Sequence, residues 1–197
     1  MLSLMKKDLD VLTKQYKMYV ILLVFFLCAG SVSTTDEFFS TFPIVLSSWF
    51  TASLIAYDER EGFVPESKKL YVQEKYLFQL AIAGLSLIIT VAGLCGRYTV
   101  GGAEFCNVLL TMLAAAFLVP AAVFPLIFKL TAAKATLKYL LVLAVAVGVC
   151  YYFSAAFEYR YIAQIGLPVC IGAGIAFAAV LFLSYKMSVK HYEKREN

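Results

Sequence analysis

The sequence predicts an all-α membrane protein with six transmembrane helices, an N-terminal amphipathic interfacial helix and both termini in the cytoplasm. Hydrophobic residues make up 62% of the 197 residues, and charged residues only 15%. The apolar residues gather in six segments, close to the ~20 residues that cross a bilayer. Lysine and arginine fall on alternate connections between them. The segments run roughly over Tyr19–Val32, Phe38–Tyr57, Tyr76–Cys95, Asn107–Phe128, Leu137–Ala156 and Gly166–Tyr185.

The basic residues define the orientation, because cytoplasmic loops retain them. With the N-terminus inside, fifteen of the 17 lysines and arginines lie on the inside, and only Arg97 and Arg160 lie outside. We therefore expect the formal charge of +4 to serve contacts with lipid headgroups and not with nucleic acid. Residues 1–197 are expected to form a single transmembrane domain.

Residues 1–17 are predicted to form the interfacial helix. Their apolar side chains follow one helical face, at Leu2, Met5, Leu9, Leu12 and Tyr16. A lysine-rich helix of this kind lies in the cytoplasmic membrane interface, and a plain positive anchor is the alternative. The lysines followed by an apolar run also resemble a secretory signal, but the long charged stretch and the five further spans favour an uncleaved anchor.

The predicted external connections are short. Ser33–Glu37 is acidic and joins the first two spans as a hairpin, and Gly101-Gly102 marks a turn within Gly96–Cys106. Phe157–Ile165 is rich in aromatic residues, which suit either an interfacial belt or a short helix that re-enters the membrane.

The fourth span carries Pro120 and Pro125. Each removes a backbone donor, so this helix is expected to be kinked, either as a tolerated feature of a packed bundle or as a hinge. Lys129 and Lys134 follow it as cytoplasmic anchors. In the last two spans, small residues allow close helix packing, at Ala144, Gly148, Gly172, Gly174 and Ala176.

The residues needed for several kinds of chemistry are missing from the sequence. The five cysteines form no C-x-x-C pair, and His191 is the single histidine, so no metal site is expected. A disulfide between Cys95 and Cys106 is one alternative to their acting as small apolar residues. No ionisable residue lies well inside a span, which argues against an ion-coupled pump or a membrane enzyme. A phosphate-binding G-x-x-x-x-G-K-[ST] loop is also absent, so we expect no cofactor on this chain.

The longest inside connection is Asp58–Lys75. Asp58, Glu59 and Glu61 stand at the C-terminal end of the second span, where the helix dipole favours cations, so we expect them to serve something outside that helix. The remainder is predicted to form a short helix after Pro65, with proline in the first turn. A solvated loop that merely follows the positive-inside rule is the alternative.

Three segments resemble small type-2 ABC exporter permeases. Ala56–Arg60 with Val64–Val72 and Lys75-Tyr76 resembles the first cytoplasmic loop of that family. Phe124–Leu130 with Lys134 resembles its Pro-aliphatic-Phe-Lys signature, and Leu4–Leu9 is similar to its interfacial helix.

The resemblance implies a permease subunit that is not itself an enzyme. It implies pairing with a second permease chain, as a homo- or heterodimer, and with ABC ATPase subunits that bind ATP and Mg. The cargo would be amphipathic peptides, such as phenol-soluble modulins or antimicrobial peptides, or lipid-like molecules, exported across a bacterial plasma membrane. Residues 58–75 would form the coupling loop, with an ATPase-contact surface at Tyr57, Asp58, Glu59, Arg60, Pro65, Ser67, Lys68 and Lys69. A non-transporting scaffold or sensor subunit that recruits a soluble partner through this loop is the alternative.

Overall fold

The computed structural model describes residues 2–15, 17, 21, 24–25, 37–63, 65, 67–96, 98–130, 141–142, 144–149 and 166–195. Within them the chain forms helices α1 (Leu2–Gln15), α3 (Glu37–Arg60), α4 (Lys68–Cys95), α5 (Ala103–Lys129) and α7 (Leu167–Glu193). The predicted all-α class is confirmed. Most of the predicted first and fifth spans, the loop at 157–165 and Lys134 lie outside the described residues; 141–142 and 144–149 are helical.

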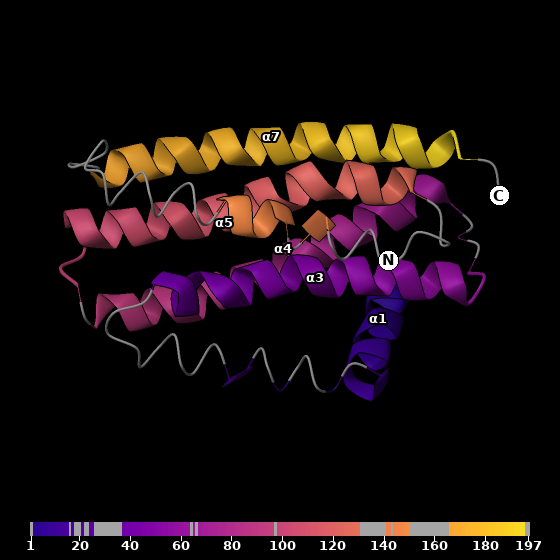
Figure 1. Ribbon diagram of the computed structural model, residues 1–197, viewed down its shortest axis with the longest axis horizontal. Helices are drawn as coiled ribbons and strands as arrows, with labels where there is room; N and C mark the ends of the chain where they lie inside the picture. The colour runs from indigo at the N-terminus through magenta and orange to yellow at the C-terminus, as the bar shows by residue number, and fades with distance from the viewer. Residues whose placement is uncertain are drawn as a thin grey trace.

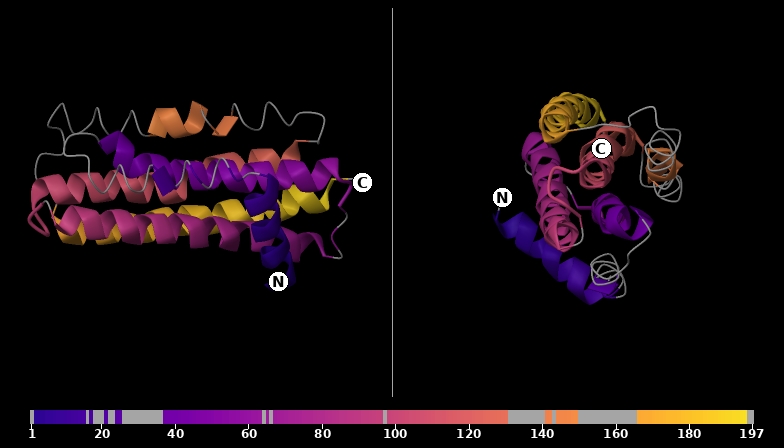
Figure 2. Two further views of the ribbon diagram at one scale, coloured as in Figure 1. Left: turned by 90° about the horizontal axis from the view of Figure 1, so that it is seen from below. Right: turned by 90° about the vertical axis from the view of Figure 1, so that its left-hand side faces the viewer.

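Four long helices run side by side along one axis, and α1 lies across them (Figure 1). Seen end-on, α1 lies on the outside of the bundle (Figure 2). The turn between α3 and α4 and the C-terminal end of α7 lie at the same end of the bundle (Figure 1). The predicted N-terminal helix is therefore confirmed as a helix, and its place in a membrane interface remains a prediction.

Helix α5 occupies the middle of the described bundle, and its apolar residues are largely buried. Its most extensive packing is against α7, whose other side carries many exposed apolar side chains. Among the described residues, α4, α5 and α7 are long and apolar enough to cross a membrane. This supports a membrane protein, and the six-span arrangement with both termini inside remains a prediction.

The connection between α3 and α4 is shorter than predicted. Helix α3 continues through Arg60, and α4 begins at Lys68 with Ser67 as its N-cap, where the Leu70 amide donates to Ser67 Oγ at 3.4 Å. The predicted separate helix with Pro65 in its first turn is wrong, because Pro65 precedes this cap. Nothing between Lys68 and Lys75 breaks the helix, so that segment is continuous with the apolar span.

The other predictions for connections and prolines have separate outcomes. Gly101 adopts a φ of +83° in the turn before α5, as predicted. Cys95 and Cys106 are free thiols, so the disulfide alternative is wrong. Helix α5 is continuous through the buried Pro120 and Pro125, and their role as a hinge stays a prediction.

Candidate functional site

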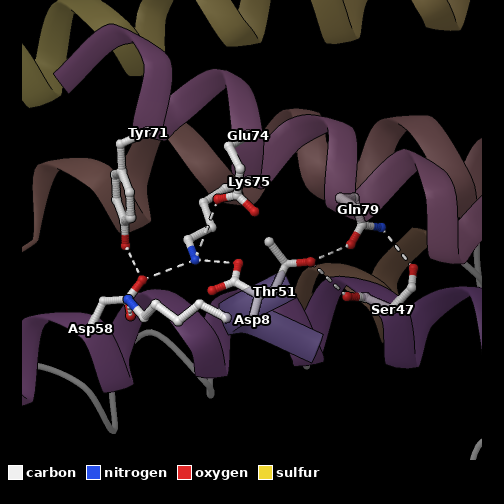
Figure 3. Close-up of polar contacts among 9 residues, drawn as sticks. Asp8, Ser47, Thr51, Asp58, Tyr71, Glu74, Lys75 and Gln79 are labelled. Carbon is white, nitrogen blue, oxygen red and sulfur yellow. Dashed lines mark hydrogen bonds and ion pairs between the residues drawn. The ribbon is translucent and has the colours of Figure 1, made fainter. Parts of the chain in front are cut away.

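A buried ion-pair cluster joins α1, α3 and α4 at the charged end of the bundle. Its centre is the Lys75 ammonium, which lies 2.5 Å from Asp8 Oδ2 and 2.9 Å from Asp58 Oδ2. The side chains of Lys75 and Asp8 are each only 1% exposed. Figure 3 shows the two carboxylates, from α1 and α3, converging on this one cation of α4. We call Lys7, Asp8, Asp58, Tyr71, Glu74 and Lys75 the Lys75 cluster.

Asp58 is held by three partners at once. Its Oδ1 accepts from Lys7 Nζ at 2.6 Å, and its Oδ2 accepts from the Tyr71 hydroxyl at 2.9 Å as well as pairing with Lys75. Burial alone would raise the pKa of this carboxyl, but the attraction of Lys75, reinforced by Lys7, outweighs burial and lowers the pKa below its ordinary 3.8. Asp58 is therefore an ionised anchor between helices.

Glu74 adds a third carboxyl group beside the Lys75 ammonium. Its Oε2 lies 3.5 Å from Lys75 Nζ, and the side chain is fully buried. Neither of its oxygens accepts a hydrogen bond from the part of the chain that the structure describes. Burial raises the pKa of Glu74 to about 7, against the attraction of Lys75 and with the repulsion of Asp8, so Glu74 is the least readily ionised carboxyl of the Lys75 cluster.

The C-terminal end of the described chain closes on the same region. Arg195 Nη1 pairs with Glu59 Oε1 at 2.6 Å, and Lys68 Nζ donates to the Arg195 carbonyl oxygen at 2.7 Å. Lys68 also lies 5.9 Å from the centre of the Tyr192 ring. The turn between α3 and α4 is therefore fastened on one side to α1 and on the other to α7.

A small exposed surface remains on this turn. Arg60, Glu61 and Lys69 are exposed, and Leu70 is 50% exposed in the first turn of α4. The Arg60 guanidinium stacks on the Tyr57 ring at 5.5 Å. These residues lie at the end of the bundle, where a soluble partner could reach them. We call Arg60, Glu61, Lys69 and Leu70 the turn surface.

The structure separates the predicted contact residues into two groups. Arg60 and Lys69 are exposed and belong to the turn surface. The other six are partly or fully buried, namely Tyr57, Asp58, Glu59, Pro65, Ser67 and Lys68. Asp58, Glu59 and Lys68 bind groups outside their own helix. Ser67 caps α4, Pro65 lies between α3 and α4, and the Tyr57 ring stacks with Arg60. Asp58 and Glu59 do serve groups outside their own helix, as expected, but the partners that the structure records lie within this chain. Lys129, a predicted anchor, is exposed at the end of α5.

Sequence reasoning missed the role of Lys75, which it placed at the end of the cytoplasmic connection Asp58–Lys75. Once α4 is known to begin at Lys68, Lys75 falls on the same helical face as Tyr71, Val72 and Gln79, all of which are buried. This position on the buried face of α4 was the signal that the sequence offered for Lys75. The partner Asp8 carried no comparable signal, because only the packing of α1 across the bundle brings it to Lys75.

Polar contacts continue between α3 and α4 beyond the cluster (Figure 3). The Gln79 amide donates to Ser47 Oγ at 2.7 Å and to Ser48 Oγ at 3.0 Å, and its carbonyl accepts from Thr51 Oγ1 at 3.0 Å. The described part of the chain holds no group of three or more His, Cys, Asp or Glu side chains placed for a metal ion. The arrangement is therefore suited to fastening helices together and to presenting the turn surface.

The chain matches the ABC-2 family transporter protein family over residues 3–193, and so belongs to that family. It is a membrane subunit of the ABC permease type. No curated protein and no solved structure matches it significantly.

Proposed function

We propose that this chain is the permease half of an ATP-driven exporter of amphipathic peptides or lipid-like molecules. A partner ABC ATPase would bind ATP and Mg, dock on the turn surface and drive two paired permease chains in a bacterial plasma membrane. The observation that carries the proposal is the family match over residues 3–193, combined with an exposed surface at the end of the bundle where a soluble partner could reach it.

The architecture of the charged end supports a route for force. Movement of the turn between α3 and α4 would pass to α1 through Asp58, Lys7 and Lys75, and to α7 through Glu59 and Arg195. Buried, multiply bonded charges hold defined positions better than packing alone. In this proposal Asp58 positions the turn and does not itself contact the ATPase.

The cargo class follows from the chemistry of the described spans. Their polar side chains are mainly Ser, Thr, Gln and Tyr, and no Asp, Glu, Lys or Arg lies well inside a segment predicted to cross the membrane. Such walls suit an amphipathic or lipid-like molecule better than a small ion, which needs fixed compensating charge.

The test is purification of the tagged chain from its native membrane in mild detergent, with mass spectrometry of the proteins that accompany it. We expect a stoichiometric ATPase with a phosphate-binding loop, and its loss when Lys69 and Leu70 are both replaced by Glu. Lys14→Glu, an exposed change on α1, is the matched control and should keep the ATPase.

Recovery of the chain with a non-ATPase protein would overturn the proposal in favour of a scaffold or sensor. Retention of the ATPase by the Lys69→Glu, Leu70→Glu variant would remove the turn surface as the docking site. Transport itself is tested by ATP-dependent movement of a labelled amphipathic peptide into inside-out vesicles that contain both proteins.

A further inference from the structure

A groove on the outer side of the bundle is separate from the Lys75 cluster and approaches the turn surface only at Lys69. It has a volume of about 340 Å³ and is formed between α4, α5 and α7, with Gln73, Tyr76, Leu77, Leu80, Phe117, Ala178, Leu181, Phe182 and Tyr185 as its lining. This volume falls within the roughly 300–1,000 Å³ of ligand sites. The lining is almost entirely apolar, and the groove is partly open to the surface.

The wall of the groove is fixed before any ligand arrives. The Tyr76 hydroxyl bonds inward to Ser184 Oγ and Ser188 Oγ, each at 2.8 Å, so its ring stands against the groove with no free polar end. The ring also packs edge-on against Phe124 at 5.0 Å and Tyr185 at 5.6 Å. A preformed apolar wall loses little conformational entropy when an apolar chain binds to it.

One end of the groove carries positive charge. Lys186 Nζ lies 4.8 Å from the centre of the Phe182 ring, which lines the groove. Lys190 lies one turn further along α7, and Lys69 lies one turn before Gln73 on α4, on the same side of each helix. All three lysines are exposed. None of them pairs with a carboxylate among the described residues, whereas Lys7 and Lys75 do.

The other direction along the groove is apolar. Leu77 and Leu85 of α4 and Ile175 and Phe182 of α7 are all between 41% and 69% exposed. These residues belong to helices long and apolar enough to cross a membrane, so their exposed sides are expected to face lipid. The lysines stand at the end that the positive-inside rule assigns to the cytoplasm.

We propose that this groove binds one anionic phospholipid of the cytoplasmic leaflet, with an acyl chain against Tyr76 and Phe182 and the headgroup at Lys69, Lys186 and Lys190. Charge complementarity selects this occupant, because unpaired cations at one end and an apolar wall at the other match an anionic head and its chain. Gln73 stands between the two parts, where its amide can donate to the ester oxygens. The site goes beyond the proposed function and does not depend on transport or on an ATPase.

The experiment uses brominated lipids, which quench a nearby tryptophan. The chain has a single tryptophan, Trp49, so Phe182→Trp in a Trp49→Phe background places the only reporter at the groove. The full chain is reconstituted in phosphatidylcholine vesicles that contain equal mole fractions of brominated phosphatidylglycerol or brominated phosphatidylcholine. Ile175→Trp in the same background is the matched control, since Ile175 is exposed on α7 about two turns away.

We expect phosphatidylglycerol to quench the Phe182→Trp reporter more strongly than phosphatidylcholine, with no such preference at Ile175→Trp. Replacing Lys69, Lys186 or Lys190 by Gln should reduce the preference about fivefold per lysine. Ala178→Phe fills the groove and leaves all three lysines in place, so it should also abolish the preference. Size-exclusion chromatography and circular dichroism check that this variant is folded.

Three results would overturn the proposal. Equal quenching of the Phe182→Trp reporter by both lipids would mean that no anionic lipid is selected. An equal preference at Ile175→Trp would mean a general attraction of the charged end for anionic lipid. A preference that survives Ala178→Phe would mean that the headgroup binds without the groove.

Discussion

Two helix pairs of this bundle are joined by opposite kinds of contact. Between α3 and α4, the buried contacts are ion pairs and side-chain hydrogen bonds, from Asp58 with Lys75 to Thr51 with Gln79. Between α5 and α7, the helices pack closely with small residues, and side chains reach backbone carbonyls, as Ser184 Oγ does with Ala121 at 2.8 Å and Cys170 Sγ with Cys106 at 3.3 Å.

The difference shows where each pair draws its specificity. Apolar helices in lipid gain little from the hydrophobic effect on association, so α5 and α7 rely on close packing along their length. A charge pair is costly to bury, but it fixes which residues must meet. The pair that carries the turn surface is the pair whose register is set by charge.

The largest expected effect comes from removing the shared cation. Lys75→Met leaves Asp8 and Asp58 buried with less compensation, and we expect it to lower the free energy of unfolding by about 3–5 kcal/mol. The measurement is denaturation of the purified chain in mixed micelles. Lys69→Met, an exposed change on the same helix, is the control and should stay within about 0.5 kcal/mol of the parent.

Glu74→Gln tests the same cluster, but it should not lower the free energy of unfolding as Lys75→Met does. It replaces a buried carboxyl whose pKa is raised to about 7 by a neutral amide and supplies a donor next to Asp8, so the free energy of unfolding should be unchanged or higher. A loss as large as that of Lys75→Met would show that Glu74 is an essential partner and would contradict our account of the cluster.

The close packing between α5 and α7 should be sensitive to side-chain size. Ala121→Leu places a larger side chain where Ser184 approaches the α5 backbone, and we expect a loss of about 1–3 kcal/mol in the same micelle assay. Gly174→Ala is the matched small change, because a Cβ there would stand 3.6 Å from Leu113 Cδ1, an ordinary contact distance. Equal effects of the two changes would argue against size as the limiting factor.

The hydrogen-bonded part of the polar pair should respond more weakly. Gln79→Leu leaves the hydroxyls of Ser47, Ser48 and Thr51 without their amide partner. We expect a loss of about 1–2 kcal/mol, since hydrogen bonds between membrane helices contribute modestly. An effect equal to that of Lys75→Met would mean that the ionic and neutral contacts do not differ as we describe.

The smallest and most specific effect is on pH dependence. The pKa of Asp58 is lowered in the folded chain, so its contribution to stability is fully present above the ordinary pKa of 3.8 and is lost as the pH falls through the lower, folded-state pKa. Unfolding of the parent should therefore become easier at acidic pH below about 4. Asp58→Asn should flatten this part of the profile; an unchanged slope would show that other carboxyls are responsible.

Much of the fold was predictable because the membrane imposes a strict length and polarity on helices. The spans Phe38–Tyr57 and Asn107–Phe128 coincide closely with α3 and α5, and Gly166–Tyr185 matches the start of α7, which continues to Glu193. The start of α4 was misplaced by eight residues, because Lys68, Lys69 and Lys75 were read as loop charges. A hydropathy pattern marks where a helix is apolar, not where its hydrogen bonding begins.

The sequence by itself determined the helical class, the apolar segments, the polarity of the two ends of the bundle and the position of the turn between α3 and α4. Each of these depends on composition or on neighbours along the chain. The tertiary structure alone decided that Asp58 is buried, that Lys75 joins α1 to α3, and that residues of α4, α5 and α7 line one groove. Those contacts join residues up to 136 positions apart in sequence, as Glu59 and Arg195 are, and only the packing of whole helices brings such residues together.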